Sequence, residues 1–146
     1  AGMDYTADEA FAERLHKECP GVKLMQAVLV DGPAAVDRAK HYATFCDFLL
    51  TDSGLAADTG IGASGMTHDW SIDAEIVRSV NIPVIVAGGL GPDNVEECIR
   101  QIHPYGVDSL TKTSYKYSDG VMEMDIDKER LFCPRADAAA AEYENK

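Results

Sequence analysis

Four short apolar segments recur along this chain, and each is preceded or followed by a segment with the pattern of an amphipathic helix. The apolar segments are residues 22–30, 47–52, 84–87 and 107–111. Short strands that are nearly all apolar, with helices between them, are typical of a parallel sheet covered on both faces. Each crossover in such a sheet is expected to be right-handed. The alternation therefore predicts an α/β fold built from parallel βα units.

Two architectures accommodate this order of elements: an open doubly wound sheet and a segment of a (βα)8 barrel. A complete barrel typically takes about 250 residues. The chain has 146 residues, which suits one domain and leaves room for about four βα units, half of such a barrel. Periodicity alone leaves the choice between the two architectures open.

The predicted helices span residues 6–18, 33–44, 71–79, 92–102 and 127–143. Thr6 followed by Glu9 has the spacing of a capping box, which predicts Thr6 as the first N-cap. Gly91 or a neighbour is expected to cap the fourth helix. Pro134 is expected to interrupt the last helix, because proline lacks the N–H that a helix interior needs.

Charge and composition narrow the classes of partner. The formal net charge is −12, and a field of that sign repels nucleic acid and anionic membranes. No apolar run approaches the roughly 20 residues of a membrane span. The four cysteines lack CxxC spacing and the four histidines do not cluster with them. We therefore expect no nucleic-acid or membrane partner, no metal, no cofactor, and free thiols in the cytoplasm.

Polar residues and glycines gather where three of the predicted strands end, at residues 52–54, 87–90 and 108–113. Both parallel-sheet architectures place their sites at the carboxyl ends of the strands, because the following loops converge there. Asp52 is the sharpest candidate, since it follows four residues of a buried strand. Desolvation at that position would raise its pKa towards the range of a general acid. The alternative is a carboxylate that binds backbone amides at the strand end.

Two glycine-containing segments and one lysine are candidates for holding an anion. Residues 60–67, which include Ser64 and Gly65, are small enough to let backbone N–H groups approach an anion, although a mobile loop has the same composition. Gly88 and Gly89 precede a predicted helix whose N-terminus favours a phosphate, and a tight turn is the alternative. Lys112 is either a phosphate ligand or a solvated lysine.

Four blocks of sequence resemble the phosphoribosylanthranilate isomerase family in their order and spacing. They are residues 49–53 (LLTDS), 62–70 (GASGMTHDW), 83–95 (PVIVAGGLGPDNV) and 104–108 (PYGVD). On this resemblance, the four strands are the fifth to eighth of a (βα)8 barrel. Residues 1–146 would then form a single domain, the C-terminal half of the barrel.

Members of that family open the ribose ring of phosphoribosylanthranilate and rearrange it to a 1-amino-ketose in tryptophan biosynthesis. The resemblance implies that Asp52 is the general acid. It implies that the general base is a cysteine at the end of the first barrel strand, which this chain lacks. The residues that it implies for binding the phosphorylated substrate are Ser64, Gly65, Gly88, Gly89, Asp108, Thr111 and Lys112.

Two blocks depart from the family pattern. Ala63, Met66 and His68 replace residues of its glycine-rich loop. The last strand of the family usually ends in Asp-Val-Ser-Ser-Gly-Val-Glu, whereas residues 108–113 read DSLTKT here. The phosphate cradle is therefore altered.

These observations leave three hypotheses: an isomerase acting on a phosphorylated sugar derivative, a non-catalytic half-barrel that binds a phosphorylated ligand or serves assembly, and a phosphate-binding barrel with different chemistry. A half-barrel has two bare sheet edges and an exposed apolar interior face. We therefore expect a homo-oligomer, or pairing with a missing N-terminal half-barrel.

Overall fold

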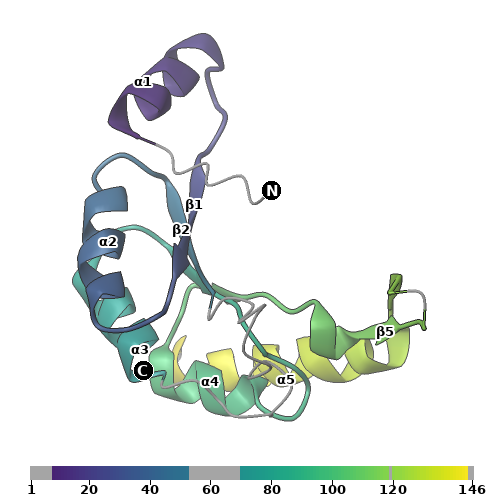
Figure 1. Ribbon diagram of the computed structural model, residues 1–146. Helices are drawn as coiled ribbons and strands as arrows, with labels where there is room; N and C mark the ends of the chain where they lie inside the picture. The colour runs from purple at the N-terminus through teal and green to yellow at the C-terminus, as the bar shows by residue number, and fades with distance from the viewer. Residues whose placement is uncertain (1–7, 53–69, 119, 145–146) are drawn as a thin grey trace.

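A computed structural model describes residues 8–52, 70–118 and 120–144. Its main sheet has four parallel strands in the order β1-β2-β3-β4 (Figure 1). The elements in chain order are α1 (Glu9–Glu18), β1 (Met25–Leu29), α2 (Ala34–Tyr42), β2 (Phe48–Asp52), α3 (Ser71–Ser79), β3 (Val84–Val86), α4 (Val95–Ile102) and β4 (Gly106–Val107). The 3-10 helix η2 (Thr111–Thr113), a hairpin of β5 (Ser114–Lys116) and β6 (Met122–Met124), and α5 (Ile126–Glu144) follow.

The order of the strands distinguishes the two predicted architectures. A doubly wound sheet reverses direction at a switch point, so its first strand lies inside the sheet. Here each strand lies beside its predecessor from β1 to β4, as in the wall of a barrel. The sheet therefore has the topology of four consecutive strands of a (βα)8 barrel, which confirms the predicted fold class.

Helices cover one face of this sheet. Val28, Leu49 and Val84 point from three neighbouring strands into a core formed with α2 and α3. On the opposite face, Met25 and Leu29 are 50% and 49% exposed. The prediction of a sheet covered on both faces is therefore wrong for the described residues. The uncovered face corresponds to the interior of a barrel, where side chains of the other strands would pack.

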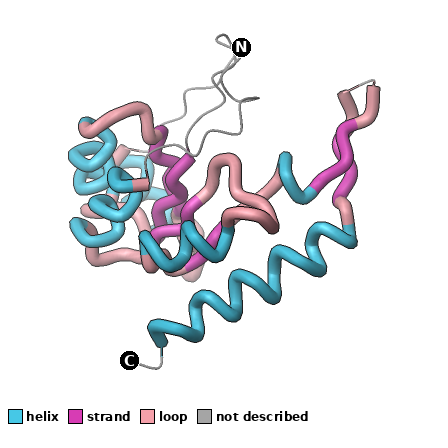
Figure 2. The backbone as a smooth tube through the Cα atoms, turned by 90° about the horizontal axis from the view of Figure 1, so that it is seen from below, coloured by secondary structure: helices cyan, strands magenta, loops and turns pink. Residues whose placement is uncertain are grey.

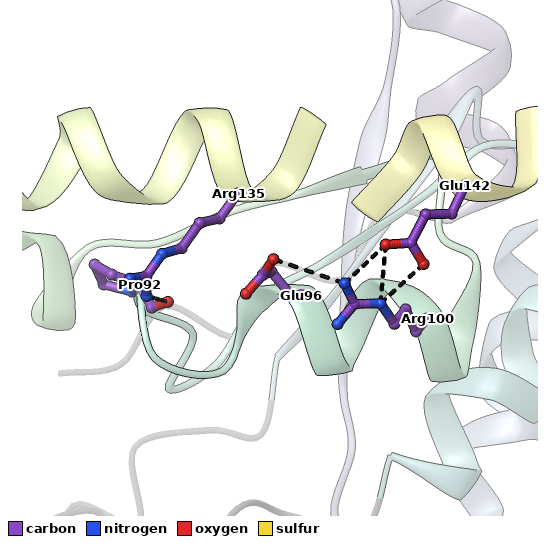
Figure 3. Close-up of polar contacts among 5 residues, drawn as sticks. All are labelled: Pro92, Glu96, Arg100, Arg135 and Glu142. Carbon is purple, nitrogen blue, oxygen red and sulfur yellow. Dashed lines mark hydrogen bonds and ion pairs between the residues drawn. The ribbon is translucent and has the colours of Figure 1, made fainter. Parts of the chain in front are cut away.

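A second core joins α4 and α5 to the sheet. Val86, Ile99 and Phe132 belong to this core, together with Trp70 at the start of α3. At its edge the guanidinium of Arg100 on α4 donates two hydrogen bonds to the carboxylate of Glu142 on α5, with Nε–Oε2 and Nη2–Oε1 distances of 2.9 and 2.8 Å (Figure 3). The last helix is thus held against the βα units by apolar packing and by an ion pair.

Two predicted helix starts are corrected by the structure. The first helix begins at Glu9, and its N-cap is Asp8, whose side chain accepts a hydrogen bond of 2.7 Å from the N–H of Phe11. Thr6, the predicted cap, lies outside the described residues. The fourth helix begins at Val95 with Asn94 at the N-cap position, because residues 92–94 form a turn before it.

The region from the end of β4 onward departs furthest from prediction. The last strand ends at Val107, and only the N–H of Asp108 continues its ladder, so the predicted extension to residue 111 is wrong. A β5–β6 hairpin that the sequence pattern did not predict lies between η2 and α5, and it extends beyond the first turn of α5 (Figure 2). Pro134 lies inside α5 and does not end the helix. Phe132 before it and Ala139 after it are both buried against α4, and this packing holds the two parts of the helix in place.

Candidate functional site

The candidate site lies at the carboxyl edge of the main sheet. The N–H of Ala87 donates to the carbonyl oxygen of Thr51 at 2.8 Å, and the N–H of Asp108 donates to that of Val86 at 2.9 Å. The ladder therefore continues one residue past β3 and β4. It places Asp52 and Asp108 in one row across the sheet. Two strand spacings separate them, so their backbones lie about 10 Å apart.

Asp52 ends β2 on the face away from the helices. Thr51 beside it is fully buried, whereas Asp52 is exposed, as the alternation of a strand requires. The expectation of a dry setting for this carboxylate is wrong for the described chain. The physical reason is that the same face leaves Met25 and Leu29 open to solvent.

Gly88 and Gly89 form a turn with left-handed backbone conformations. Their φ angles are +94° and +67°, which only glycine adopts readily. A Cβ added at Gly89 would meet nothing within 4 Å, so the space beside it is open. Among the described residues, none accepts a hydrogen bond from the N–H of Gly88, Gly89 or Leu90. Successive backbone N–H groups in such a turn form a concave site suited to an anion.

Two side chains that the sequence analysis did not single out hold this turn. The amide of Asn94 accepts a hydrogen bond from the N–H of Gly91 at 2.8 Å and donates one to the carbonyl oxygen of Gly89 at 3.0 Å. The hydroxyl of Ser109 donates to the carbonyl oxygen of Leu90 at 2.6 Å. Gly91 and Asn94 are three residues apart at a helix start, and this spacing could have predicted the bond between the Gly91 N–H and the Asn94 side chain. Nothing in the local pattern marks Ser109.

Lys112 lies against the same turn. A Cβ added at Gly91 would lie 2.7 Å from the Cβ of Lys112. Position 91 therefore requires glycine, because η2 lies so close that it leaves no room for a Cβ atom. Thr111 and Lys112 are exposed, whereas Thr113 is buried. The structure thus brings two of the predicted anion-binding blocks side by side; Ser64 and Gly65, the third block, lie outside the described residues.

None of the four cysteines ends a strand of the main sheet. Burial, and secondarily the negative charge of Asp73, raises the pKa of the Cys98 thiol to about 12. Burial is also the first cause of the raised pKa of Cys46 and Cys133. A thiol with a raised pKa is protonated at neutral pH and is a poor base or nucleophile. Cys19 follows α1, far from the strand ends in sequence.

Two further features bear on the kind of site. No three His, Cys, Asp or Glu side chains of the described residues are grouped so that they would hold a metal ion. The helices within the described ranges are all too short or too polar to cross a membrane.

A parallel sheet whose strands follow one another in sequence, with helices outside and polar residues at the carboxyl ends, defines a segment of a (βα)8-barrel protein. The sequence profile described as "PRAI: N-(5'phosphoribosyl)anthranilate (PRA) isomerase" matches residues 6–110. The chain belongs to the N-(5'-phosphoribosyl)anthranilate isomerase family.

Individual relatives agree with this assignment. The chain is 40% identical over 106 residues to N-(5'-phosphoribosyl)anthranilate isomerase 2 of Methanosarcina mazei, which covers 73% of this chain and 46% of that protein. It is 43% identical over 88 residues to N-(5'-phosphoribosyl)anthranilate isomerase of Haloferax volcanii, covering 60% of this chain and 38% of that protein. The chain therefore spans less than half the length of these relatives.

Solved structures show the same fold. The N-(5'-phosphoribosyl)anthranilate isomerase of Pyrococcus furiosus is similar with a TM-score of 0.64 and 30% identity, over 91% of this chain and 59% of that one. A phosphoribosyl anthranilate isomerase solved in complex with reduced 1-(o-carboxyphenylamino)-1-deoxyribulose 5-phosphate has a TM-score of 0.66 over 90% of this chain and 56% of its own. At 21% identity, this second likeness supports the fold alone.

Proposed function

We propose that this chain supplies the general acid and the phosphate-binding side of a phosphoribosylanthranilate isomerase active site. The observation that carries the proposal is the placement of Asp52 at the carboxyl end of β2, beside the strand that leads into the Gly88–Gly89 turn. An acid and an anion-binding turn on neighbouring strands suit a substrate that carries both a sugar ring and a phosphate.

In the proposed reaction, Asp52 protonates the ring oxygen of the ribose while the ring opens. A general base then removes the proton at C2, which leads to the 1-amino-ketose. This chain has no cysteine at a strand end and its buried thiols have a raised pKa, so the base comes from outside the described strands. The match of residues 6–110 to the N-(5'-phosphoribosyl)anthranilate isomerase family supports a phosphorylated substrate of this class.

The phosphate is proposed to lie on the N–H groups of Gly88 and Gly89, which bond to none of the described residues, with the ammonium of Lys112 nearby. A local cation and backbone dipoles are needed, because the net charge of −12 disfavours an anion. Ser64, Gly65 and Thr111 complete the proposed lining. Asp108 is assigned to the sugar, since its carboxylate would repel the phosphate if the two lay side by side.

A second half-barrel is proposed to complete the site. Met25 and Leu29 are half exposed on the inner face, and no other described strand pairs with the outer edge of β1. Exposed apolar faces and open strand edges favour association. The proposed occupant is an N-terminal half-barrel of the same family, which would bring the missing base; a second copy of this chain is the alternative. The free thiols suggest that this assembly is cytoplasmic.

A non-catalytic half-barrel is the second candidate function. The observation that favours it is the altered sequence after β4, where the chain leaves the sheet after Asp108 and residues 111–113 form η2. A half-barrel that retained the turn at Gly88 and Gly89 would still bind a phosphorylated ligand.

The two candidates are separated by reconstitution. The chain is mixed with the N-terminal half of the Methanosarcina mazei relative, the part it does not match, and the consumption of phosphoribosylanthranilate is followed by fluorescence. The proposal predicts turnover that requires both halves and disappears in Asp52→Asn. Stable association and phosphate binding without turnover would support the non-catalytic candidate.

A further inference from the structure

The peptide between Leu90 and Gly91 is held at both of its polar ends. Its carbonyl oxygen accepts the 2.6 Å hydrogen bond from the hydroxyl of Ser109. Its N–H donates the 2.8 Å hydrogen bond to the side-chain oxygen of Asn94. The two side chains come from different elements, since Ser109 follows β4 and Asn94 precedes α4. Because a peptide is planar, bonds at both ends fix its orientation.

The preceding peptide is held from one side. The carbonyl oxygen of Gly89 accepts a hydrogen bond from the amide of Asn94 at 3.0 Å. The N–H of Leu90 lies in the same trans peptide plane and points in the opposite direction, away from Asn94. Leu90 itself is 1% exposed. Glycine pairs with positive φ have wide conformational freedom, and these bonds tether the C-terminal end of the pair. The backbone that carries the N–H groups of Gly88 and Gly89 is thereby anchored on that side before any ligand arrives.

We infer that Ser109 is a positioning residue for the anion-binding turn, an inference that rests on the proposed phosphate site. It fixes the turn from the side of β4, and the same segment carries Lys112 onto Gly91. Ser109 therefore ties the turn to the segment that carries the lysine.

The test uses the full chain and inorganic phosphate as the probe. Wild type, Ser109→Ala, Ser109→Val and Ser109→Thr are titrated, and the amide resonances of Gly88 and Gly89 are followed by NMR. Loss of the hydroxyl is expected to weaken phosphate binding by about tenfold, and threonine, which keeps the hydroxyl, is expected to restore it to within about threefold. Ser79→Ala is the matched control, since its hydroxyl bonds Glu75 on an exposed helix surface.

The outcomes separate the inference from the proposed function. If wild type binds phosphate at Gly88 and Gly89 and Ser109→Ala binds it equally well, the positioning role is wrong and the phosphate site stands. If phosphate leaves the Gly88 and Gly89 resonances of wild type unchanged, the phosphate site and the role of Ser109 both fall. Thermal unfolding midpoints are recorded for every variant. A loss of affinity at a temperature where all variants are folded supports positioning over general destabilisation.

Discussion

Asp47, just before β2, accepts a hydrogen bond of 2.8 Å from the backbone N–H of Leu24, just before β1. The same carboxylate is bonded by the ring of His16 at 2.9 Å and by the ammonium of Lys23 at 3.0 Å. One side chain thus joins α1, the approach to β1 and the start of β2. The Asp47 side chain is only 19% exposed, so these bonds are partly shielded from water.

Asp47→Asn is expected to lower the free energy of unfolding by about 1–2 kcal/mol, because it weakens several charge-assisted hydrogen bonds at once. Urea denaturation measures the change. Glu18→Gln is the control, since the Arg14–Glu18 pair is exposed and should contribute less than about 0.5 kcal/mol. Equal effects of the two changes would contradict the role given to Asp47.

The stability that Asp47 contributes should depend on pH. The backbone N–H of Leu24, then Lys23 and His16, hold the pKa of this carboxyl well below its ordinary value of 3.8. A group whose pKa is lowered by folding stabilises the protein above its unfolded-state pKa, and this stability is lost as the pH falls below it. The stability gap between wild type and Asp47→Asn should therefore shrink below pH of about 4. A gap that widens on acidification would refute this.

Gly91→Ala should destabilise the chain by about 1–3 kcal/mol, because its new Cβ would meet the Cβ of Lys112 at 2.7 Å. The clash predicts a specific rescue. Lys112→Gly removes the opposing Cβ and should recover part of the loss in the double variant, whereas Lys112→Ala keeps that Cβ and should recover less. A double-mutant cycle by chemical denaturation measures the coupling. Full additivity in both cycles would argue against close approach.

The attachment of α5 should depend on packing more than on its ion pair. Phe132 is 6% exposed, and Phe132→Ala should cost about 3–4 kcal/mol. Glu142→Gln should cost less than about 1 kcal/mol, because Arg100 and Glu142 are 45% and 52% exposed. Circular dichroism melts of both variants test the ranking. A larger loss from Glu142→Gln would reverse it.

The main sheet could be predicted from sequence because its strands are buried on the helix side. Leu49 and Val84 are enclosed, so selection for apolar residues is strong and the segments stand out. The same apolar pattern placed Asp52 at a strand end, as the structure does. The half-barrel interpretation also predicted an exposed interior face, where Met25 and Leu29 lie.

The region after β4 could not be predicted for a different reason. Each hairpin strand has three residues, and Tyr115 and Met124 are 53% and 62% exposed, so neither periodicity nor burial marks them. The bond from Ser109 to Leu90 joins residues 19 positions apart, which local patterns do not encode. Pro134 predicted a break in the last helix. The packing of the neighbouring helical turns against the core keeps the helix continuous.

The most direct test of the central claim is the kinetic effect of Asp52→Asn in the reconstituted assembly. The account predicts a fall in kcat of about a hundredfold to ten-thousandfold, with KM for phosphoribosylanthranilate changed by less than about threefold, because a general acid acts in the transition state. Lys112→Ala is the matched control and should raise KM more than it lowers kcat. An Asp52→Asn assembly that retains the kcat of wild type would contradict the claim that this chain supplies the acid.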